Sequence, residues 1–411
     1  MKYLSRLFQP VITIPKGAKI KNTEITCKSQ KLLLECGLIR PTSAGFFTIL
    51  PLARRGLDKL EQLLHSNLQK VHAQRISLPC LTSAKLWEKT GRLESIGSEL
   101  FTMEDRHEKK FLLAPTHEEA IADLMVDIGP VSYKQLPLLL YQITNKYRDE
   151  LRPKHGLLRA REFQMMDLYG IHNDVKCAEG TYSKVTQVYK DFFRELDLPV
   201  HQVVAPSGDM GGTLSHEWQL PASAGEDSLA ICPSCSHTQL DSKACVQCGK
   251  EMTILQSIEV GHTFILGTKY SEPLQAKCVQ PDSKPTPLVM SCYGIGITRL
   301  LAASLEALSS ETSLRWPKSI APFSAIVIGP KEGSTEWSKH GADGIEAVAH
   351  ALDEVLPDDV IVDDRHNLTI GKRLLTADRM GYPYILVCGR NSVVKHHQDT
   401  NFTQTDGENR Y

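Results

Sequence analysis

The sequence has no apolar run of the roughly eighteen residues that a membrane-spanning helix needs, and no hydrophobic core of a secretory signal follows its start. It also lacks an excess of either charge, because 47 basic and 48 acidic side chains leave a formal net charge of -1. No internal repeat is evident. We therefore expect neither a membrane-spanning nor a secreted protein, and any polyanion must be met by a local basic patch.

The length of the chain predicts more than one domain. At 411 residues, with 41% hydrophobic and 23% charged side chains, it is long enough for two or three globular units that each bury a core. The first residues, MKYLSRLFQP, carry Lys2 and Arg6 among apolar side chains, and no acid precedes Glu24. We expect residues 1–25 to be an N-terminal extension that carries an organelle-targeting presequence, with a frayed terminus as the alternative.

The segment at residues 51–73 predicts an amphipathic helix, because apolar residues recur there at steps of three and four. The members of this stripe are Leu57, Leu60, Leu64, Leu68 and Val71. The run RISLPCL that follows predicts a short strand containing Pro79. Because proline removes a donor from the hydrogen-bond ladder, we expect this strand at a sheet edge or an interface.

A basic stretch, YRDELRPKHGLLRAREF, spans residues 147–163 and holds five Arg or Lys side chains and one His. From Tyr141 onwards apolar and polar residues alternate, which predicts a half-buried strand with a polar working face. The loop LRPKHG and a second, antiparallel strand follow. The period of two predicts that one face of this hairpin carries Arg148, Glu150, Arg159 and Phe163.

These residue types suit a nucleoside triphosphate, because guanidinium groups fit phosphate oxygens and an aromatic ring stacks on a base. A solvated edge hairpin with charge pairs is the alternative for this segment alone. The stretch MSCYGIGITRLLAASLEAL adds a strand that runs through Gly294 and Gly296 into a helix bearing Arg299. Two glycines before a helix are a weak signal, since close backbone packing explains them equally well.

From Pro322 onwards short β-branched runs alternate with helical patterns. This order is typical of βαβ crossovers and a mainly parallel sheet, so we predict a separate α/β domain at residues 321–390. The last residues, 391–411, are polar and aperiodic, and we expect a disordered polar tail.

Eleven cysteines without a secretory signal favour thiols or metal ligands over disulfides. Four of them form two C-x-x-C pairs: Cys232, Cys235, Cys245 and Cys248. Two such pairs complete a closed tetrahedral four-thiolate site, so we predict a structural zinc ion, with disulfides as the alternative.

The stretch LSHEWQL offers the residue types of a hydrolase triad in Ser215, His216 and Glu217. Consecutive residues on a strand point to opposite faces of a sheet. These three side chains therefore cannot form a nucleophile relay among themselves.

Several stretches together match one family: GFFTILPLARRGLDKLE with Pro79, APTHEEAI, YRDELRPKHGLLRAREF, GHTFILGTKYS and SCYGIGITR. On these motifs the chain, from about Thr26 to Arg390, resembles the class II aminoacyl-tRNA synthetases, and specifically the prolyl-tRNA synthetases of bacterial and mitochondrial type. The resemblance implies an α+β fold. Its parts would be an antiparallel catalytic sheet flanked by helices at residues 26–320, with a cysteine-bearing insertion at about 226–258, and an α/β anticodon-binding domain at residues 321–390.

The resemblance also implies a reaction. The enzyme would activate proline with ATP to prolyl-adenylate and transfer it to the 3′ end of tRNA(Pro), with Mg²⁺ at the phosphates. It would act as a homodimer built by the first family motif, GFFTILPLARRGLDKLE with Pro79. Its compartment would be the mitochondrial matrix, with the cytoplasm as the alternative. Because the substrate supplies the nucleophile, the protein needs positioning and charge stabilisation and no covalent catalyst.

Residue roles follow from the family motifs as expectations. Arg148 would hold the α-phosphate and the proline carboxylate, Arg159 and Arg299 the outer phosphates, and Glu150 and Phe163 the adenine. The proline ammonium would bind Thr116 and Glu118. The pocket wall would comprise His262, Phe264 and Cys292, with plain core packing as the alternative for His262 and Cys292. Since a missing methylene changes binding by only about 1–3 kcal/mol, alanine should be activated too.

The chain departs from the family pattern in three places. It lacks the large editing insertion of bacterial relatives, so editing within the chain is not expected. Ala114 stands where many relatives have threonine, and the C-terminal domain is shorter than that of family members whose domain continues through further elements. One rival function is a catalytically inactive, synthetase-like tRNA-binding or regulatory protein, and the retained Arg148, Arg159 and Arg299 argue against it. The other is a zinc-ribbon nucleic-acid-binding module, and the acidic Asp241 and Glu251 beside the cysteines argue against it.

Overall fold

The computed structural model describes residues 2–10, 24–389, 393–396 and 403–404. It divides into two compact units. We call residues 43–47 and 61–303 the central unit, and the described residues of 1–42, 48–60 and 304–411 the terminal unit. None of the described helices is both long and apolar enough to cross a membrane.

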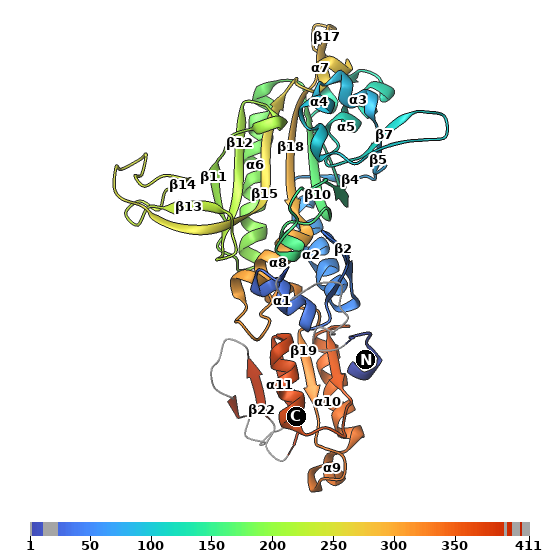
Figure 1. Cartoon of the computed structure of the whole chain (residues 1–411), viewed down its shortest axis with the longest axis vertical. Coiled ribbons are helices and arrows are strands. Elements are labelled where there is room, and N and C mark those ends of the chain that lie inside the picture. The colour runs from blue at the N-terminus through green and yellow to red at the C-terminus, as the bar shows by residue number, and fades with distance from the viewer. Residues whose placement is uncertain (1, 11–23, 390–392, 397–402, 405–411) are drawn as a thin grey trace. The chain divides into compact units, whose positions relative to one another are not determined.

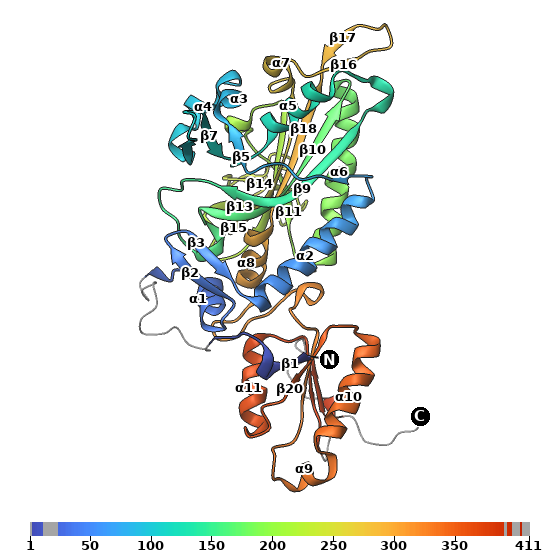
Figure 2. The same ribbon diagram turned by 90° about the vertical axis from the view of Figure 1, so that its right-hand side faces the viewer.

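A large, almost wholly antiparallel sheet forms the centre of the central unit (Figure 1). From edge to edge its main strands are β11 (His201–Val204), β12 (Leu214–Pro221), β15 (Thr253–Gly267), β18 (Val289–Gly296), β10 (Glu162–His172), β9 (Leu138–Tyr147) and β4 (Gln74–Arg75). Helix α6 (Val175–Glu195) packs on β10, β15 and β18, as Figure 2 shows from the side, and buries Val185, Tyr189 and Phe192. The amphipathic pattern of α6 therefore covers one face of the sheet and leaves the other for polar side chains.

The strand register places five residues in one row across the sheet. Glu217 of β12 pairs with His262 of β15, and His262 pairs with Gly294 of β18. Gly294 also pairs with Asp167 of β10, and Asp167 pairs with Gln142 of β9. Directly paired residues share a face of the sheet, so four polar side chains converge on one face, with a glycine between them.

Smaller elements surround one end of this sheet. They are α3 (Ala84–Lys89), α4 (Arg92–Ser95), α5 (Glu118–Ile128), α7 (Ser271–Leu274), the sheet of β5 (Leu81–Ser83), β7 (Lys110–Leu113) and β6 (Thr102–Glu104), and the sheet of β17 (Pro285–Pro287), β16 (Lys277–Val279) and β8 (Val131–Ser132). Strands β13 (Asp227–Ile231) and β14 (Thr238–Leu240) form a lobe with the start of β15, which projects from the sheet in Figure 1. We call residues 226–258 the cysteine lobe, because all four clustered cysteines lie in it.

The terminal unit contains the predicted α/β domain. Strands β20 (Val360–Asp363), β19 (Ala325–Ile328) and β21 (Tyr384–Val387) pair in parallel. They alternate along the chain with α10 (Ala342–Val355) and α11 (Ile370–Met380), which confirms the βαβ pattern; α9 (Thr335–His340) was not predicted. The unit also holds α1 (Lys28–Glu35), the pair β2 (Ile39–Ser43) and β3 (Phe46–Ile49) in part, and the first half of α2 (Pro51–Gln69).

Both chain ends differ from the sequence prediction. Lys2 and Tyr3, expected in a presequence, form β1 (Lys2–Tyr3) and pair in parallel with β20, and the Tyr3 hydroxyl donates to Glu346 at 2.8 Å. A 3-10 turn at Leu4–Arg6 follows, and residues 11–23 of the predicted presequence lie outside the described part. The expected disordered tail is corrected at β22 (Val393–His396), which pairs antiparallel with β21, and at β23 (Thr403–Gln404), which pairs antiparallel with β22. The β-branched Val393 and Val394 favour such an added strand.

The helix prediction for residues 51–73 is confirmed, because its four leucines are completely buried on α2. Val71 lies beyond the end of that helix. The prediction that Pro79 lies in a strand is wrong, because Pro79 lies between β4 and β5. Its missing donor therefore interrupts the extended run RISLPCL, and the short β4 that remains lies at the sheet edge.

Candidate active site

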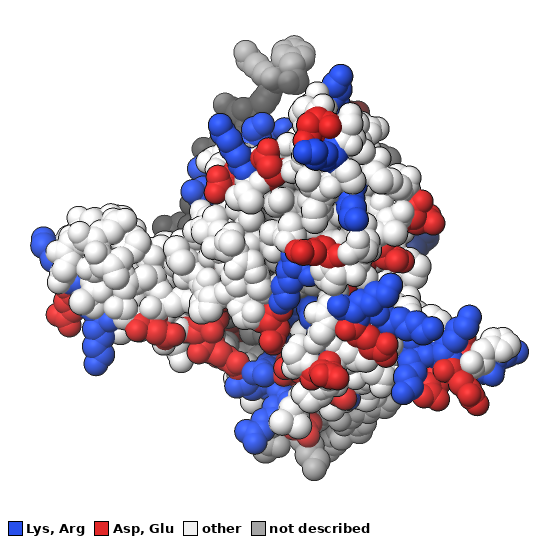
Figure 3. All heavy atoms as spheres, turned by 90° about the horizontal axis from the view of Figure 1, so that it is seen from above, with Lys and Arg blue, Asp and Glu red and all other residues white. Residues whose placement is uncertain are grey.

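A pocket of about 420 Å³ opens on the polar face of the central sheet, and all of its walls come from the central unit. On the face of the molecule shown in Figure 3, acidic and basic side chains are interspersed. The structure brings all ten side chains predicted for substrate binding to this pocket: Thr116, Glu118, Arg148, Glu150, Arg159, Phe163, His262, Phe264, Cys292 and Arg299. Their positions are therefore compatible with one site, while their individual roles stay predictions.

Guanidinium groups gather at one end of the pocket. The Arg148 guanidinium lies 5.2 Å from the Phe163 ring centre. Arg148 and Arg299 both line the pocket, and burial and the charge of Arg299 lower the pKa of Arg148. Burial opposes ionisation of Glu259, but His262, Arg299 and Arg148 lower its pKa below the ordinary value. A protein carboxylate thus lies where these cations could instead meet an anionic substrate.

Arg159 is held by two carboxylates at the same end. It donates to Glu150 at 2.7 Å and to Glu226, the first residue of the cysteine lobe, at 2.9 Å. Arg299, near the start of α8 (Ile297–Leu308), donates to the backbone carbonyl of Leu158 at 2.8 Å. The segment that carries the basic residues is therefore fixed without a ligand.

The predicted two-strand face is wrong in detail. Strand β9 ends before Arg148, and β10 begins only at Glu162, so Arg148, Glu150 and Arg159 lie outside both strands. A turn with left-handed backbone at His155 (φ 58) and Gly156 (φ 62) lies between the two strands. Arg148, Glu150 and Arg159 come together because the irregular segment between the strands folds back. Only Phe163 reaches the pocket through the alternation of side chains along a strand.

A separate part of the pocket lining is built around a carboxylate. Glu118, the first residue of α5, is completely buried, and its Oε2 accepts from the Thr116 hydroxyl at 2.5 Å. Among the described residues, no N–H or O–H donor reaches its Oε1. Burial, the charge of Glu118 and a hydrogen bond from the thiol to Glu118 raise the pKa of Cys292 well above its usual value, so Cys292 is a neutral thiol in the pocket wall.

His262 is a wall residue with both ring nitrogens occupied. Its Nδ1 contacts Glu259 at 3.0 Å, and its Nε2 contacts the Ser215 hydroxyl at 2.6 Å. The His262 ring stacks on Phe264 with centres 4.0 Å apart. Ser215 is buried and does not line the pocket, so this chain of contacts positions His262 and provides no exposed nucleophile.

The rejection of a triad among three consecutive residues agrees with the structure. His216 contacts the Tyr182 hydroxyl at 2.7 Å, whereas Glu217 accepts from Gln219 at 2.9 Å. Ser215 contacts neither of these partners but reaches His262 on β15. Neighbouring residues of β12 point to opposite faces of the sheet, which separates His216 from Ser215 and Glu217.

Sequence reasoning missed a buried polar network beneath the pocket. Asp167 lines the pocket, and its carboxylate forms an ion pair with Lys146 at 2.6 Å and accepts from Gln142 at 2.9 Å and from the Tyr169 hydroxyl at 2.8 Å. The predicted alternation from Tyr141 puts Lys146 on the polar face of the strand, but its side chain is completely buried. The available signal was parity, because Asp167 lies four residues after Phe163 on the same strand and therefore on the same face.

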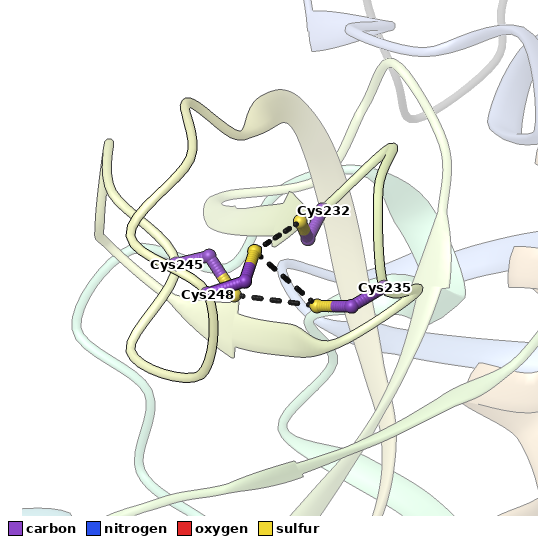
Figure 4. A group of neighbouring side chains, drawn as sticks. All are labelled: Cys232, Cys235, Cys245 and Cys248. Atoms are coloured by element: carbon purple, nitrogen blue, oxygen red, sulfur yellow. Dashed lines mark hydrogen bonds between the residues drawn. The ribbon is translucent and has the colours of Figure 1, made fainter.

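The four cysteines of the lobe converge, as Figure 4 shows. Their Sγ atoms lie 3.5 Å apart for Cys232 and Cys248, 3.6 Å for Cys235 and Cys245, and 3.6 Å for Cys235 and Cys248. All four are free thiols. Zinc bound at about 2.3 Å by four tetrahedral sulfurs would separate them by about 3.8 Å, so this arrangement fits the ion closely.

Comparison with known proteins gives consistent matches. The family described as tRNA synthetase class II core domain (G, H, P, S and T) matches residues 101–308, and the family described as anticodon binding domain matches residues 324–401. A human protein named probable proline--tRNA ligase, mitochondrial, is 43% identical over 95% of this chain and 84% of its own length. A proline--tRNA ligase from Ehrlichia chaffeensis is 33% identical over 91% of each chain.

Solved structures show the same fold. A Giardia lamblia prolyl-tRNA synthetase in complex with prolyl-adenylate aligns with a TM-score of 0.79 at 18% identity, over 92% of this chain and 74% of that one. A Cryptosporidium parvum enzyme of the same name, complexed with halofuginone and AMPPNP, aligns with a TM-score of 0.77 at 15% identity, over 96% and 76% of the two chains. At these identities the likeness concerns the fold, and it covers both units.

Proposed function

Because this chain belongs to the proline--tRNA ligases of the class II tRNA synthetases, we propose that its central pocket holds proline and ATP end to end and joins them as prolyl-adenylate. The observation that carries the proposal is the polarity of the pocket. One part of the lining holds Glu118, whose buried Oε1 has no N–H or O–H donor among the described residues, and another part holds the guanidinium groups of Arg148 and Arg299. An amino acid with a cationic amine and an anionic carboxylate, followed by a triphosphate, matches this order.

In this arrangement Glu118 and Thr116 bind the proline ammonium, and Phe264 and Cys292 contact the ring. Arg148 holds the proline carboxylate and the α-phosphate together, so that a carboxylate oxygen attacks the α-phosphorus and pyrophosphate leaves. The terminal ribose hydroxyl of tRNA(Pro) then attacks the carbonyl carbon, and AMP leaves. Neither step needs a protein nucleophile, which agrees with the burial of Ser215.

Adenine and the outer phosphates are assigned to the other end. Phe163 stacks on the base, Glu150 accepts from the adenine amino group, and Arg159 and Arg299 contact the outer phosphates. The two carboxylates that now hold Arg159 would release it to the stronger phosphate charge.

A magnesium ion fits beside these phosphates. The carboxylates of Glu217 and Glu259 offer oxygen ligands that lie, with a nitrogen of His262, within 4.8 Å of one another. Carboxylate oxygen is the donor that Mg²⁺ prefers, and the two glutamates, not His262, are therefore the ligands in our proposal. The ion would supply charge neutralisation of the triphosphate.

A zinc ion is proposed in the cysteine lobe, on the sulfur geometry given above. The lobe's apolar cluster holds only Ala230, Cys232, Cys245 and Met252, so the lobe has little hydrophobic core of its own. A closed four-thiolate site would replace that missing core and take no part in chemistry. Metal analysis of protein purified without chelators should find one zinc per chain, and four reactive thiols without metal would contradict the proposal.

The assembly and compartment belong to the same proposal. We infer a homodimer built by the first motif, which light scattering after size-exclusion chromatography would test.

Relatives from human and fission yeast are named mitochondrial, at 43% and 40% identity, which supports a mitochondrial location and, in our proposal, the matrix. Protease protection in isolated, outer-membrane-stripped mitochondria would separate the matrix from other locations.

The decisive assay is amino-acid-dependent exchange of labelled pyrophosphate into ATP, with proline, alanine and a panel of other amino acids, followed by charging of tRNA(Pro). Exchange with proline and charging are expected, with weaker exchange for alanine. Failure to exchange with any amino acid, in a folded and metal-replete sample, would instead support an inactive, synthetase-like protein.

A further inference from the structure

The proline end of the pocket contains a set of buried charges that does not cancel. Five charged side chains here are at most 5% exposed: Arg92, Lys146, Glu118, Glu119 and Asp167. When all five are ionised, two are cationic and three are anionic, so their sum is one negative charge. His117 beside them adds nothing, because burial and Lys146 lower its pKa.

Asp167 and Lys146 pair with each other at 2.6 Å, which leaves Arg92 between two glutamates of α5. The Arg92 Nη1 lies 3.1 Å from both carboxylate oxygens of Glu119, but 3.6 Å from the nearest oxygen of Glu118. Arg92 therefore neutralises Glu119. The uncompensated charge belongs to Glu118, whose Oε1 has no N–H or O–H donor in the described part of the chain.

Aromatic rings fix the Arg92 guanidinium in this position. It lies 4.4 Å from the Trp87 ring centre and 5.4 Å from the Tyr270 ring centre, and its Nη2 is 3.3 Å from the sulfur of Met210. A cation held between ring faces has little freedom to turn from Glu119 to Glu118.

We propose that Arg92 and Glu119 are a positioning pair for amino-acid recognition: Glu119 occupies Arg92 so that Glu118 keeps a full negative charge for the substrate ammonium. This inference rests on the proposed function, since it assigns the pair to the selection of proline's charged nitrogen. Glu119 itself does not line the pocket and need not touch the substrate.

The test removes the charge of Glu119 without changing its shape. In Glu119→Gln the charge of Arg92 is no longer neutralised by Glu119 and acts on Glu118, 3.6 Å away, so the KM for proline in pyrophosphate exchange should rise about 10- to 100-fold while the KM for ATP stays within about 2-fold. Because burial raises the pKa of Glu119 to about 7 against the opposing effect of Arg92, the assay is run at pH 8. The matched control is Glu94→Gln, which removes an exposed carboxylate from the helix of Arg92.

Removing both members of the pair restores the charge balance. The double variant Arg92→Met with Glu119→Gln should bring the KM for proline back to within about 5-fold of the wild type. If the pair only supports the fold, the double variant will bind proline no better than the single one, and that result would overturn the proposal. The double variant also decides the matter should Glu119→Gln fail to fold.

A neutral analogue gives a readout that a loosened pocket would not move. Tetrahydrofuran-2-carboxylate has the ring and carboxylate of proline but an ether oxygen in place of the ammonium. The ratio of the inhibition constant of this analogue to the KM for proline should fall at least about 10-fold in Glu119→Gln. An unchanged ratio would reject the pair, whereas absence of proline-dependent exchange in the wild type would reject the proposed function instead.

Discussion

Arg148→Gln should abolish most of the activation of proline, because one guanidinium is assigned to both reacting groups. A hydrogen bond to a charged group contributes about 1.5–3 kcal/mol, so loss of the contacts to the carboxylate and the α-phosphate costs about 3–6 kcal/mol. Relief of the repulsion between Arg148 and Arg299 offsets part of this loss. We therefore expect a net cost of about 3–4 kcal/mol, which is a roughly 150- to 1000-fold fall in kcat/KM for pyrophosphate exchange.

The fold should survive this change. The contact of Arg148 with Phe163, at 5.2 Å, contributes only about 0.5–1 kcal/mol, so Tm should move by no more than a few degrees. The matched control is Arg152→Gln, an exposed arginine on the same segment, which should exchange pyrophosphate within about 2-fold of the wild type. Less than a 5-fold loss for Arg148→Gln, or equal losses for both variants, would refute the assignment.

Three further results are expected. Cys248→Ser should reduce the zinc content and make the cysteine lobe sensitive to proteases while proline-dependent exchange persists; full metal content would contradict the ligand set. Burial lowers the pKa of His172 to about 4, so the unfolded chain alone takes up this proton between about pH 6.5 and 4, and the free energy of unfolding should fall by up to about 3 kcal/mol as the pH falls through that range. Urea unfolding of His172→Gln should show a shallower decrease, and an unchanged slope would reject the cause. Gly180→Ala, in the middle of α6 where an added Cβ meets no atom within 4 Å, should raise the stability by about 0.5–1 kcal/mol in the same assay, and a destabilised variant would contradict this.

The sequence was sufficient for features that depend on local period. The leucine stripe of α2 and the βαβ order of the terminal unit follow from the spacing of apolar residues, and both are present. The set of pocket residues was also predicted, but through the family motifs, since residues as distant as Thr116 and Arg299 share no local pattern.

Features that depend on register or on burial of charge could not be predicted. The row from Glu217 to Gln142 needs the order β12, β15, β18, β10 and β9, which is not the order of the sequence. Lys146 reads as a surface residue, and only the pairing of β9 with β10 brings Asp167 close enough to allow its burial. The turn at His155 uses a left-handed backbone that a residue other than glycine rarely signals.

The division of the terminal unit between both ends of the chain has a consequence for synthesis. Strand β1 pairs with β20, so the strand hydrogen bonds of Lys2 can form only after Ile361 has been synthesised. The central unit, in contrast, is complete once residue 303 has been synthesised. On the ribosome we therefore expect the central unit to fold first, with the amino-terminal segment still unpaired. That segment stays available to other binding partners during translation, until the last strands emerge and capture it.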